Sequence, residues 1–181
     1  MTPIVGVIVA AGSGVRLGGG IPKALRVIRG IPLVTRSAHA LVEGGCTHLV
    51  VVIADGLQAH FDRALVDVDV PVHYALGGVR RQDSVLEGLR VLDALPELNE
   101  CDIVLVHDAA RALVPATVVK NVIAAITAGA QAVIPVVPMI DSVRRDHTVH
   151  PTESVRTGSS VVDRSCLLYT SDAADDSLRV D

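Results

Sequence analysis

The chain has very few aromatic residues: two tyrosines, one phenylalanine and no tryptophan among 181 residues. Proteins that bind single-stranded nucleic acid stack bases on aromatic side chains, so this composition argues against that class of function. The net charge of −4 also argues against a general surface for polyanions. Half of the residues are hydrophobic but very few of these are aromatic, so the core must be built from valine, leucine, isoleucine and alanine.

Cysteine is also scarce, and Cys46, Cys101 and Cys166 form no C-x-x-C pair. This spacing indicates neither a disulfide framework nor a zinc site, and it fits a reducing compartment. No apolar run reaches the ~18 residues of a membrane span, and the N-terminus lacks the pattern of a signal peptide. We therefore expect a cytoplasmic protein that binds neither membranes nor nucleic acid.

Short apolar runs alternate with helical patterns along the chain, which is typical of an α/β fold with a mostly parallel sheet. The patterns predict strands over residues 4–9, 49–53, 70–74, 103–107 and 132–137, and helices near residues 33–42, 57–65, 84–95 and 116–127. Pro115 suits a first helical turn, and Gly44 and Gly129 suit helix ends. Ligands of such sheets bind at the carboxyl ends of the strands, which places residues 10–23, 75–84 and 108–112 around one site.

The first predicted strand runs into a glycine-rich turn, and backbone N–H groups in such a turn attract phosphate. The dinucleotide fingerprint does not fit, because Leu17 stands where its third glycine would fall. The P-loop pattern does not fit either, because Gly20 is followed by isoleucine and proline before Lys23. What remains is A-A-G-x-G-x-R followed by P-K, in which Arg16 and Lys23 supply positive charge.

Two further motifs follow other predicted strands. In the segment GGVRRQDS, residues 77–84, a glycine turn precedes two arginines and Ser84. It is read either as a turn with a helix cap, with Ser84 and Glu87 as a capping box, or as a nucleotide contact. In the segment HDAAR, Asp108 could bind a metal ion, cap a helix or pair with Arg111. His107 has no second ligand at zinc spacing and is expected to be a hydrogen-bonded structural histidine.

Five ordered stretches closely resemble the cytidylyltransferase family of the non-mevalonate isoprenoid pathway: VAAGSGVRLGGGIPKAL, GGVRRQDSVLEGL, VLVHDAARALV, PVVPMIDSVRR and VVDR. The resemblance implies a Rossmann-like nucleotidyltransferase (glycosyltransferase-A-like) fold, with an extended dimerisation arm around residues 141–163. It also implies transfer of CMP from CTP to 2-C-methyl-D-erythritol 4-phosphate with release of pyrophosphate. Ribitol-phosphate cytidylyltransferases share most of these motifs, so they stay an alternative.

The resemblance also implies roles for particular residues, with Mg²⁺ or another divalent cation as cofactor and a homodimer as the assembly. Arg16 and Lys23 would stabilise the charge of the transition state, and Arg164 would bind the acceptor phosphate. Asp108 would lie beside the ribose and the metal ion. The remaining contacts to CTP and the sugar-alcohol phosphate would come from Ala10, Ala11, Gly12, Gly14, Gly78, Arg81, Ser84, Ala109, Arg111 and Ser142.

The sequence departs from the family pattern after Arg164, where small, acidic and polar residues follow. We expect residues 1–165 to form an incomplete cytidylyltransferase domain and residues 166–181 to be a disordered tail that is not native to the fold. Two further hypotheses therefore stay open beside an active enzyme. One is an inactive CTP-binding fragment, and the other is a nicotinamide dehydrogenase domain, which the failed fingerprint weakens.

Overall fold

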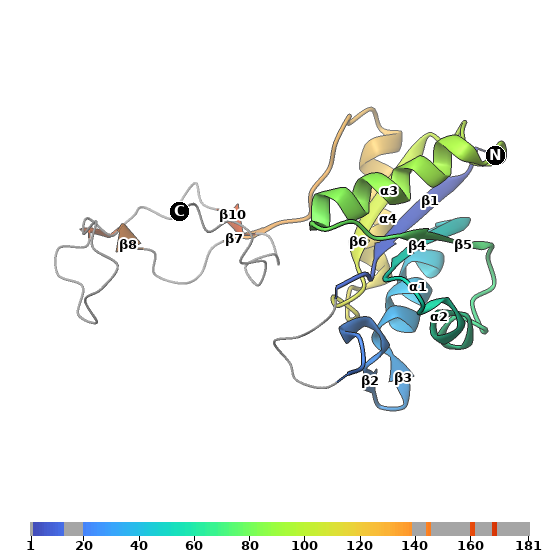
Figure 1. The fold of residues 1–181 in the computed structure, drawn as a ribbon. Helices are drawn as coiled ribbons and strands as arrows, with labels where there is room; N and C mark the ends of the chain where they lie inside the picture. Colours follow the sequence, from blue (N-terminus) through green and yellow to red (C-terminus); the bar gives the residue numbers. More distant parts are fainter. Residues whose placement is uncertain (1, 13–19, 139–143, 146–159, 162–167, 170–181) are drawn as a thin grey trace. The chain divides into compact units, whose positions relative to one another are not determined.

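The computed structural model describes residues 2–12, 20–138, 144–145, 160–161 and 168–169. The chain divides into two compact units, Met1–Gln131 and Ala132–Asp181. In chain order the elements of the first unit are β1 (Ile4–Val9), the 3₁₀ helix η2 (Lys23–Leu25), β2 (Val27–Ile28), β3 (Ile31–Pro32), α1 (Leu33–Gly44), β4 (His48–Ile53), α2 (Gln58–Ala64), β5 (Val72–Leu76), α3 (Arg81–Ala94), β6 (Ile103–Asp108) and α4 (Ala116–Thr127) (Figure 1).

The centre of the first unit is a parallel sheet of four strands in the order β5-β4-β1-β6. Val5 of β1 is in register with His48 of β4 and with Val104 of β6. A helix follows each strand of this sheet, as expected for β-α units. The predicted α/β class with a parallel sheet is therefore confirmed.

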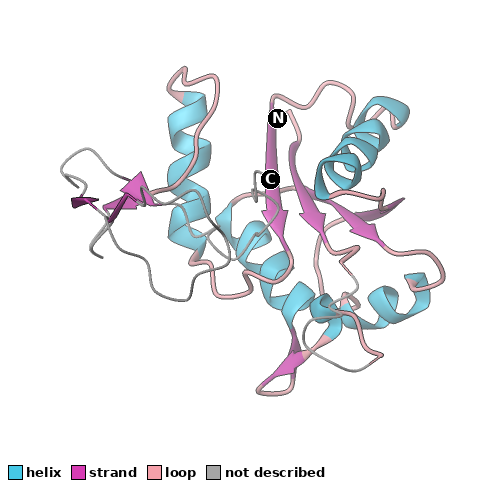
Figure 2. Ribbon diagram, turned by 60° about the vertical axis from the view of Figure 1, so that its left-hand side comes forward, coloured by secondary structure: helices cyan, strands magenta, loops and turns pink. Residues whose placement is uncertain are grey.

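Helices cover both faces of this sheet (Figure 2). On one face, β-strand side chains such as Val7 and Val52 pack with Leu92 of α3. On the other face, Ile8 and Leu49 pack with residues of α1, α2 and α4. The alternation of side chains along each strand produces these two apolar clusters, because successive residues point to opposite faces.

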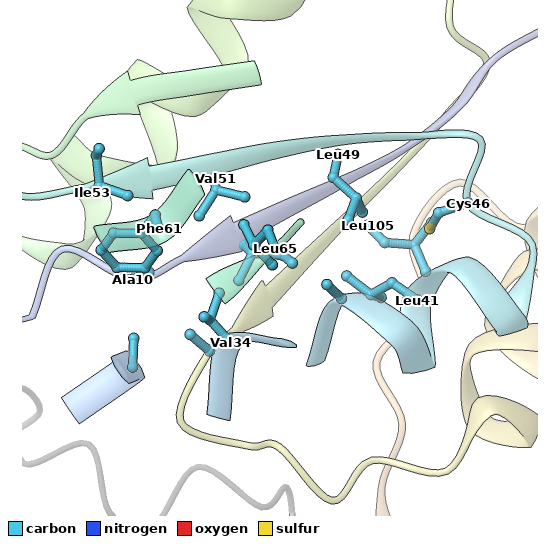
Figure 3. Packing of buried hydrophobic residues seen from close by; sticks show 14 of the residues in the cluster. Ala10, Val34, Leu41, Cys46, Leu49, Val51, Ile53, Phe61, Leu65 and Leu105 are labelled. Carbon is cyan, nitrogen blue, oxygen red and sulfur yellow. The ribbon is translucent and has the colours of Figure 1, made fainter. Parts of the chain in front are cut away.

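Aliphatic side chains make up almost all of the core, as the composition predicts. Phe61 of α2 is fully buried among Val34, Val51 and Leu65 (Figure 3). Within this cluster Cys46 is a free, buried thiol, and burial raises its pKa to about 12. Cys101 is also a free cysteine and is partly buried.

The helix ends differ in detail from the sequence prediction. Helix α1 continues to Gly44, and Gly45 rather than Gly44 adopts the left-handed conformation, with φ of 119°. Helix α4 has the predicted bounds, but Pro115 is its N-cap rather than its first residue. Gly129 lies beyond the end of α4 with φ of 104°, a conformation that glycine adopts without strain.

Two predicted strands need correction. The strand predicted over residues 70–74 begins two residues later, as β5, because Pro71 precedes it and has no N–H to donate. The strand predicted over residues 132–137 is wrong for residues 132–136, which are not in a strand. Pro135 interrupts this apolar run and removes a donor that a sheet would need.

The second unit contains two short antiparallel pairs among its described residues. β7 (Val137–Pro138) pairs with β10 (Leu168–Tyr169), and β8 (Arg144–Arg145) pairs with β9 (Ser160–Val161). Residues 168 and 169 thus form a strand within the tail that the sequence predicts to be disordered. The rest of the predicted tail, like most of the predicted dimerisation arm, lies outside the described residues, and the predicted boundary at residue 165 stays a prediction. Within the described part of the chain, no helix combines the length and apolar character needed to cross a membrane.

Candidate functional site

The candidate site lies at the carboxyl edge of the parallel sheet. Because β1, β4, β5 and β6 are parallel, the segments that follow them leave the sheet at the same edge. Residues 10–12 follow β1, residues 77–80 follow β5, and residues 109–112 follow β6. The structure therefore brings residues 10–12 of the first motif to the same edge as the second and third motifs, as the sequence predicts.

The glycine-rich loop after β1 and the glycine turn after β5 lie in direct contact. The N–H of Ala10 donates to the Val52 carbonyl at 2.8 Å, and the N–H of Gly77 donates to the Ile53 carbonyl at 2.8 Å. A Cβ added to Gly77 would lie 2.3 Å from the Cβ of Ala11. Only glycine at position 77 lets the two loops approach this closely. Ala10 itself is buried, whereas Gly12 is exposed at the end of the described part of the first loop.

The buried hydroxyl of Ser84 stabilises the glycine turn by hydrogen bonds. The N–H of Gly78 donates to the Ser84 hydroxyl at 3.1 Å, and this hydroxyl donates to the Arg80 carbonyl at 3.2 Å. Ser84 is 3% exposed, so its hydroxyl serves the turn, and the predicted contact of Ser84 with the nucleotide stays a prediction. The predicted capping box of Ser84 and Glu87 is wrong.

Helix α3 begins at Arg81, three residues before the predicted start. The N–H of Arg80 donates to the Asp83 carboxylate at 3.0 Å, so Asp83 caps the helix instead. The side chain of Arg80 also pairs with Asp83, and this interaction lowers the pKa of the Asp83 carboxyl. Arg80 and Asp83 therefore both contribute to the cap at the start of α3.

Asp108 joins the second and third motifs through two arginines. Its Oδ1 accepts hydrogen bonds from Nε and Nη2 of Arg81 at 3.0 and 2.9 Å, and its Oδ2 lies 3.2 Å from Nε of Arg111. The side chains of Asp108 and Arg111 are 20% and 30% exposed, so the group is shielded but open to solvent. The pairing of Asp108 with Arg111 is one of the alternatives that the sequence left open, whereas its pairing with Arg81 was not foreseen.

This arrangement presents positive charge and one carboxylate at the same edge. Two guanidinium groups are suited to bind phosphate oxygens, because each offers several N–H donors in a planar fork. Among the described residues, no group of three or more histidine, cysteine, aspartate or glutamate side chains could hold a metal ion.

Lys23 is the one predicted transition-state cation that falls within the described residues. It opens the helix η2 and is exposed to solvent, and the N–H of Leu25 closes the turn by donating to the Pro22 carbonyl at 3.0 Å. Four other predicted site residues lie outside the described residues, namely Gly14, Arg16, Ser142 and Arg164. Their predicted roles stay predictions.

His107 directly precedes Asp108 at the end of β6. Burial lowers the pKa of His107, and the nearby Asp108 carboxylate and a hydrogen bond with the Arg111 backbone partly oppose this shift. Its Nε2 atom is buried and, among the described residues, has no hydrogen-bond partner. Burial thus favours the neutral imidazole, and the hydrogen bond with the Arg111 backbone agrees with the hydrogen-bonded histidine that the sequence predicts.

Sequence reasoning missed Ser37, which lies on α1 and contacts the third motif. Its hydroxyl donates to the carbonyl of Ala109 at 3.1 Å. Ser37 and Ala109 are 0% and 1% exposed, and the predicted contact of Ala109 with the substrate stays a prediction. A serine on the mostly apolar face of the helix predicted over residues 33–42 is the sequence signal that could have drawn attention to this residue.

Comparisons with known proteins agree with the resemblance found in the sequence. The family model of 2-C-methyl-D-erythritol 4-phosphate cytidylyltransferase matches residues 4–167. A protein of this name from Corynebacterium diphtheriae is 38% identical over 160 residues, which cover 85% of this chain and 62% of that protein. One from Streptomyces coelicolor is 48% identical over 149 residues, which cover 77% of this chain and 52% of that protein. The chain thus spans between half and two thirds of the length of these relatives.

A solved structure supports the fold. The crystal structure of 4-diphosphocytidyl-2C-methyl-D-erythritol synthase from Anaerococcus prevotii superposes with a TM-score of 0.73 at 20% sequence identity. The superposition covers 93% of this chain and 68% of that chain. At this level of identity the comparison establishes the shared architecture.

Proposed function

Because the chain belongs to the 2-C-methyl-D-erythritol 4-phosphate cytidylyltransferase family, we propose that it transfers CMP from CTP to 2-C-methyl-D-erythritol 4-phosphate. An oxygen of the acceptor's phosphate attacks the α-phosphorus of CTP, and the bond between the α- and β-phosphates breaks. Pyrophosphate leaves with the electron pair of that bond. The observation that carries this proposal is the Arg81–Asp108–Arg111 group beside the two glycine turns.

The chemistry needs positioning and electrostatic stabilisation rather than a protein nucleophile. The backbone of residues 10–12 and the turn at Gly78 would hold the nucleotide against the sheet edge. Arg81 and Arg111 would bind phosphate oxygens, and Lys23 would stabilise the charge that grows on the departing pyrophosphate. The arginines of this group already hold their guanidinium groups at Asp108, so little rearrangement would be needed to bind a triphosphate.

Asp108 fits a magnesium ion bound mainly by the substrate. Mg²⁺ in proteins is commonly bound by one or two carboxylates together with substrate phosphates and water. The Oδ2 atom of Asp108 lies 3.2 Å from Nε of Arg111, and a carboxylate oxygen has lone pairs for more than one partner. When bound, the ion would neutralise part of the triphosphate charge.

Three further features belong to this proposal. A homodimer and Mg²⁺ dependence are supported by the family resemblance, and a cytoplasmic location is supported by the unpaired cysteine pattern. The methylerythritol phosphate acceptor is favoured over ribitol phosphate because the family model and both relatives carry that activity in their names.

A binding experiment tests the nucleotide site. CTP with Mg²⁺ should stabilise the chain against thermal unfolding, by about 2.7 kcal/mol at a hundredfold excess over Kd. NAD should give no stabilisation. Stabilisation by NAD without any effect of CTP would overturn the proposal and favour the dehydrogenase hypothesis.

Two adjacent arginines provide a matched pair of variants. Arg81 pairs with Asp108 at the site, whereas Arg80 pairs with Asp83 at the helix start. Arg81→Ala should weaken CTP binding, and Arg80→Ala should leave it within about twofold, because only the first contacts the proposed site. Equal effects of both variants would show that general surface charge, and not this site, attracts the nucleotide.

A pyrophosphate-release assay then tests catalysis. Release that requires both CTP and methylerythritol phosphate would support the full proposal. Release with ribitol 5-phosphate in place of methylerythritol phosphate would support the alternative acceptor. CTP binding without any release would support the inactive CTP-binding fragment.

A further inference from the structure

Ser37 fixes the backbone of the turn that follows β6. Its hydroxyl donates to the Ala109 carbonyl at 3.1 Å, although the two residues are 72 positions apart. On the other side, the N–H of Ala109 donates to the Val9 carbonyl at 3.0 Å. Both peptide groups of Ala109 are therefore held, one by helix α1 and the other by strand β1.

The residues on either side of Ala109 form the charged part of the candidate site. The N–H of Arg111 donates to the Asp108 carbonyl at 2.9 Å and closes a tight turn around Ala109. Because the peptide planes of Ala109 are fixed, the direction in which the Asp108 side chain leaves the backbone is fixed as well. The hydrogen bonds of the Ala109 backbone thus orient the Asp108 carboxylate toward Arg81.

A serine at this place in a helix calls for an explanation. A serine inside a helix commonly bonds the carbonyl of its own preceding turn or faces solvent. Ser37 is instead fully buried on the face of α1 that carries Val34, Ala38 and Leu41, and its hydroxyl donates to the carbonyl of Ala109 in a different segment. An alanine would suit this apolar surrounding but would leave the Ala109 carbonyl without its partner.

We propose that Ser37 is a positioning residue for the nucleotide site, which acts by holding the Asp108–Arg111 turn in the geometry that binds a metal–triphosphate group. The inference rests on the proposed function. Ser37 itself does not touch the substrate. It fixes the positions of Asp108 and Arg111, which would contact the metal–triphosphate group.

The same helix offers a matched control. Thr35 is also buried, at 7% exposure, and its hydroxyl also donates to a backbone carbonyl, that of Ala64 at the end of α2. Thr35→Val and Ser37→Ala each remove one buried hydroxyl from α1 and leave one carbonyl without its donor. Only the second change reaches the turn at the candidate site.

The experiment measures Kd for CTP with Mg²⁺ by calorimetry on the 181-residue chain, at a temperature where every variant is folded. Ser37→Ala should raise Kd about tenfold, since small displacements of positioned groups weaken binding strongly. Kd of Thr35→Val should stay within twofold of the value for the parent chain, even if its melting temperature falls as far as that of Ser37→Ala. Equal Kd values for the parent chain and Ser37→Ala, or equal losses in the two variants, would overturn the inference.

A double-mutant cycle tests whether Ser37 acts through the turn. If it does, adding Ser37→Ala to Asp108→Asn should raise Kd by less than threefold, because the group being positioned has already lost its charge. A full tenfold effect in that background would show that Ser37 acts elsewhere, and it would overturn the inference. Failure of the parent chain to bind CTP at all would instead overturn the proposed function on which the inference rests.

Discussion

Replacing Gly77 with alanine should force apart the two loops of the candidate site. The added Cβ would lie 2.3 Å from the Cβ of Ala11 and 3.1 Å from the hydroxyl oxygen of Ser84. Carbon atoms in contact lie about 3.5–4.0 Å apart, so the loops must separate by at least about 1.2 Å to relieve the first clash. The second contact crowds the hydroxyl that accepts the hydrogen bond from Gly78.

Overpacking of this kind costs about 1–3 kcal/mol, which lowers the melting temperature of a chain of this size by roughly 2–12 °C. The same separation should raise Kd for CTP about tenfold, because the backbone groups that hold the nucleotide move by an appreciable fraction of a hydrogen-bond length. Urea unfolding and calorimetric titration would measure the two effects. Gly20→Ala is the control for the stability measurement, since a Cβ at that position would meet nothing within 4 Å.

The clash also predicts a rescue. Ala11→Gly removes the opposing methyl group, so the double variant Ala11→Gly with Gly77→Ala should recover most of the stability lost by Gly77→Ala. Unchanged stability in Gly77→Ala would show that the loops do not touch as described. A double variant less stable than Gly77→Ala would show that the cost comes from some other contact.

Three further outcomes follow from other contacts and charges. Gly44→Ala should cost about 1–3 kcal/mol of unfolding free energy, because its Cβ would lie 2.3 Å from Cγ1 of Val119, and full stability by urea unfolding would contradict the close packing of α1 and α4. Burial lowers the pKa of His107 in the folded protein, so the unfolded chain binds more protons and the free energy of unfolding falls as the pH falls below about 6.5. His107→Gln should reduce this loss of stability between pH 7.5 and 5.5. An unchanged dependence of stability on pH would refute the lowered pKa of His107. Lys23→Ala should lower kcat roughly 10²–10³-fold with a smaller change in KM, whereas exposed Lys120→Ala on α4 should not, and a change in KM alone would make Lys23 a ground-state binding group.

The layers of the fold could be predicted from the sequence because apolar periodicity is a local property. The runs of β1 and β6 and the helical pattern of α4 each carry their own signal, and the observed bounds agree closely with the predicted ones. The fifth predicted strand failed for a different reason. Residues 132–137 have the apolar composition of a strand, but a strand also needs a partner and donors, and Pro135 lacks an N–H. Composition cannot show whether a neighbouring strand is present.

The place of the candidate site was predictable for a topological reason, since parallel strands deliver their following segments to one edge. The partners within the site were not. The contact of Arg81 with Asp108 spans 27 positions, and nothing in either motif indicates that these two side chains meet.

Ser84 shows the same limit at short range. Its position before an apolar helical run suggested a cap, but at the start of α3 the Asp83 carboxylate accepts from the N–H of Arg80, and the Ser84 hydroxyl accepts from the N–H of Gly78. A sequence motif thus fixes which chemical groups reach the site, whereas the choice among several possible hydrogen-bond partners depends on where the turn places each donor. For this reason the hydrogen-bond partners of Ser37 and Ser84 could be identified only from the structure, although both are ordinary serines in the sequence.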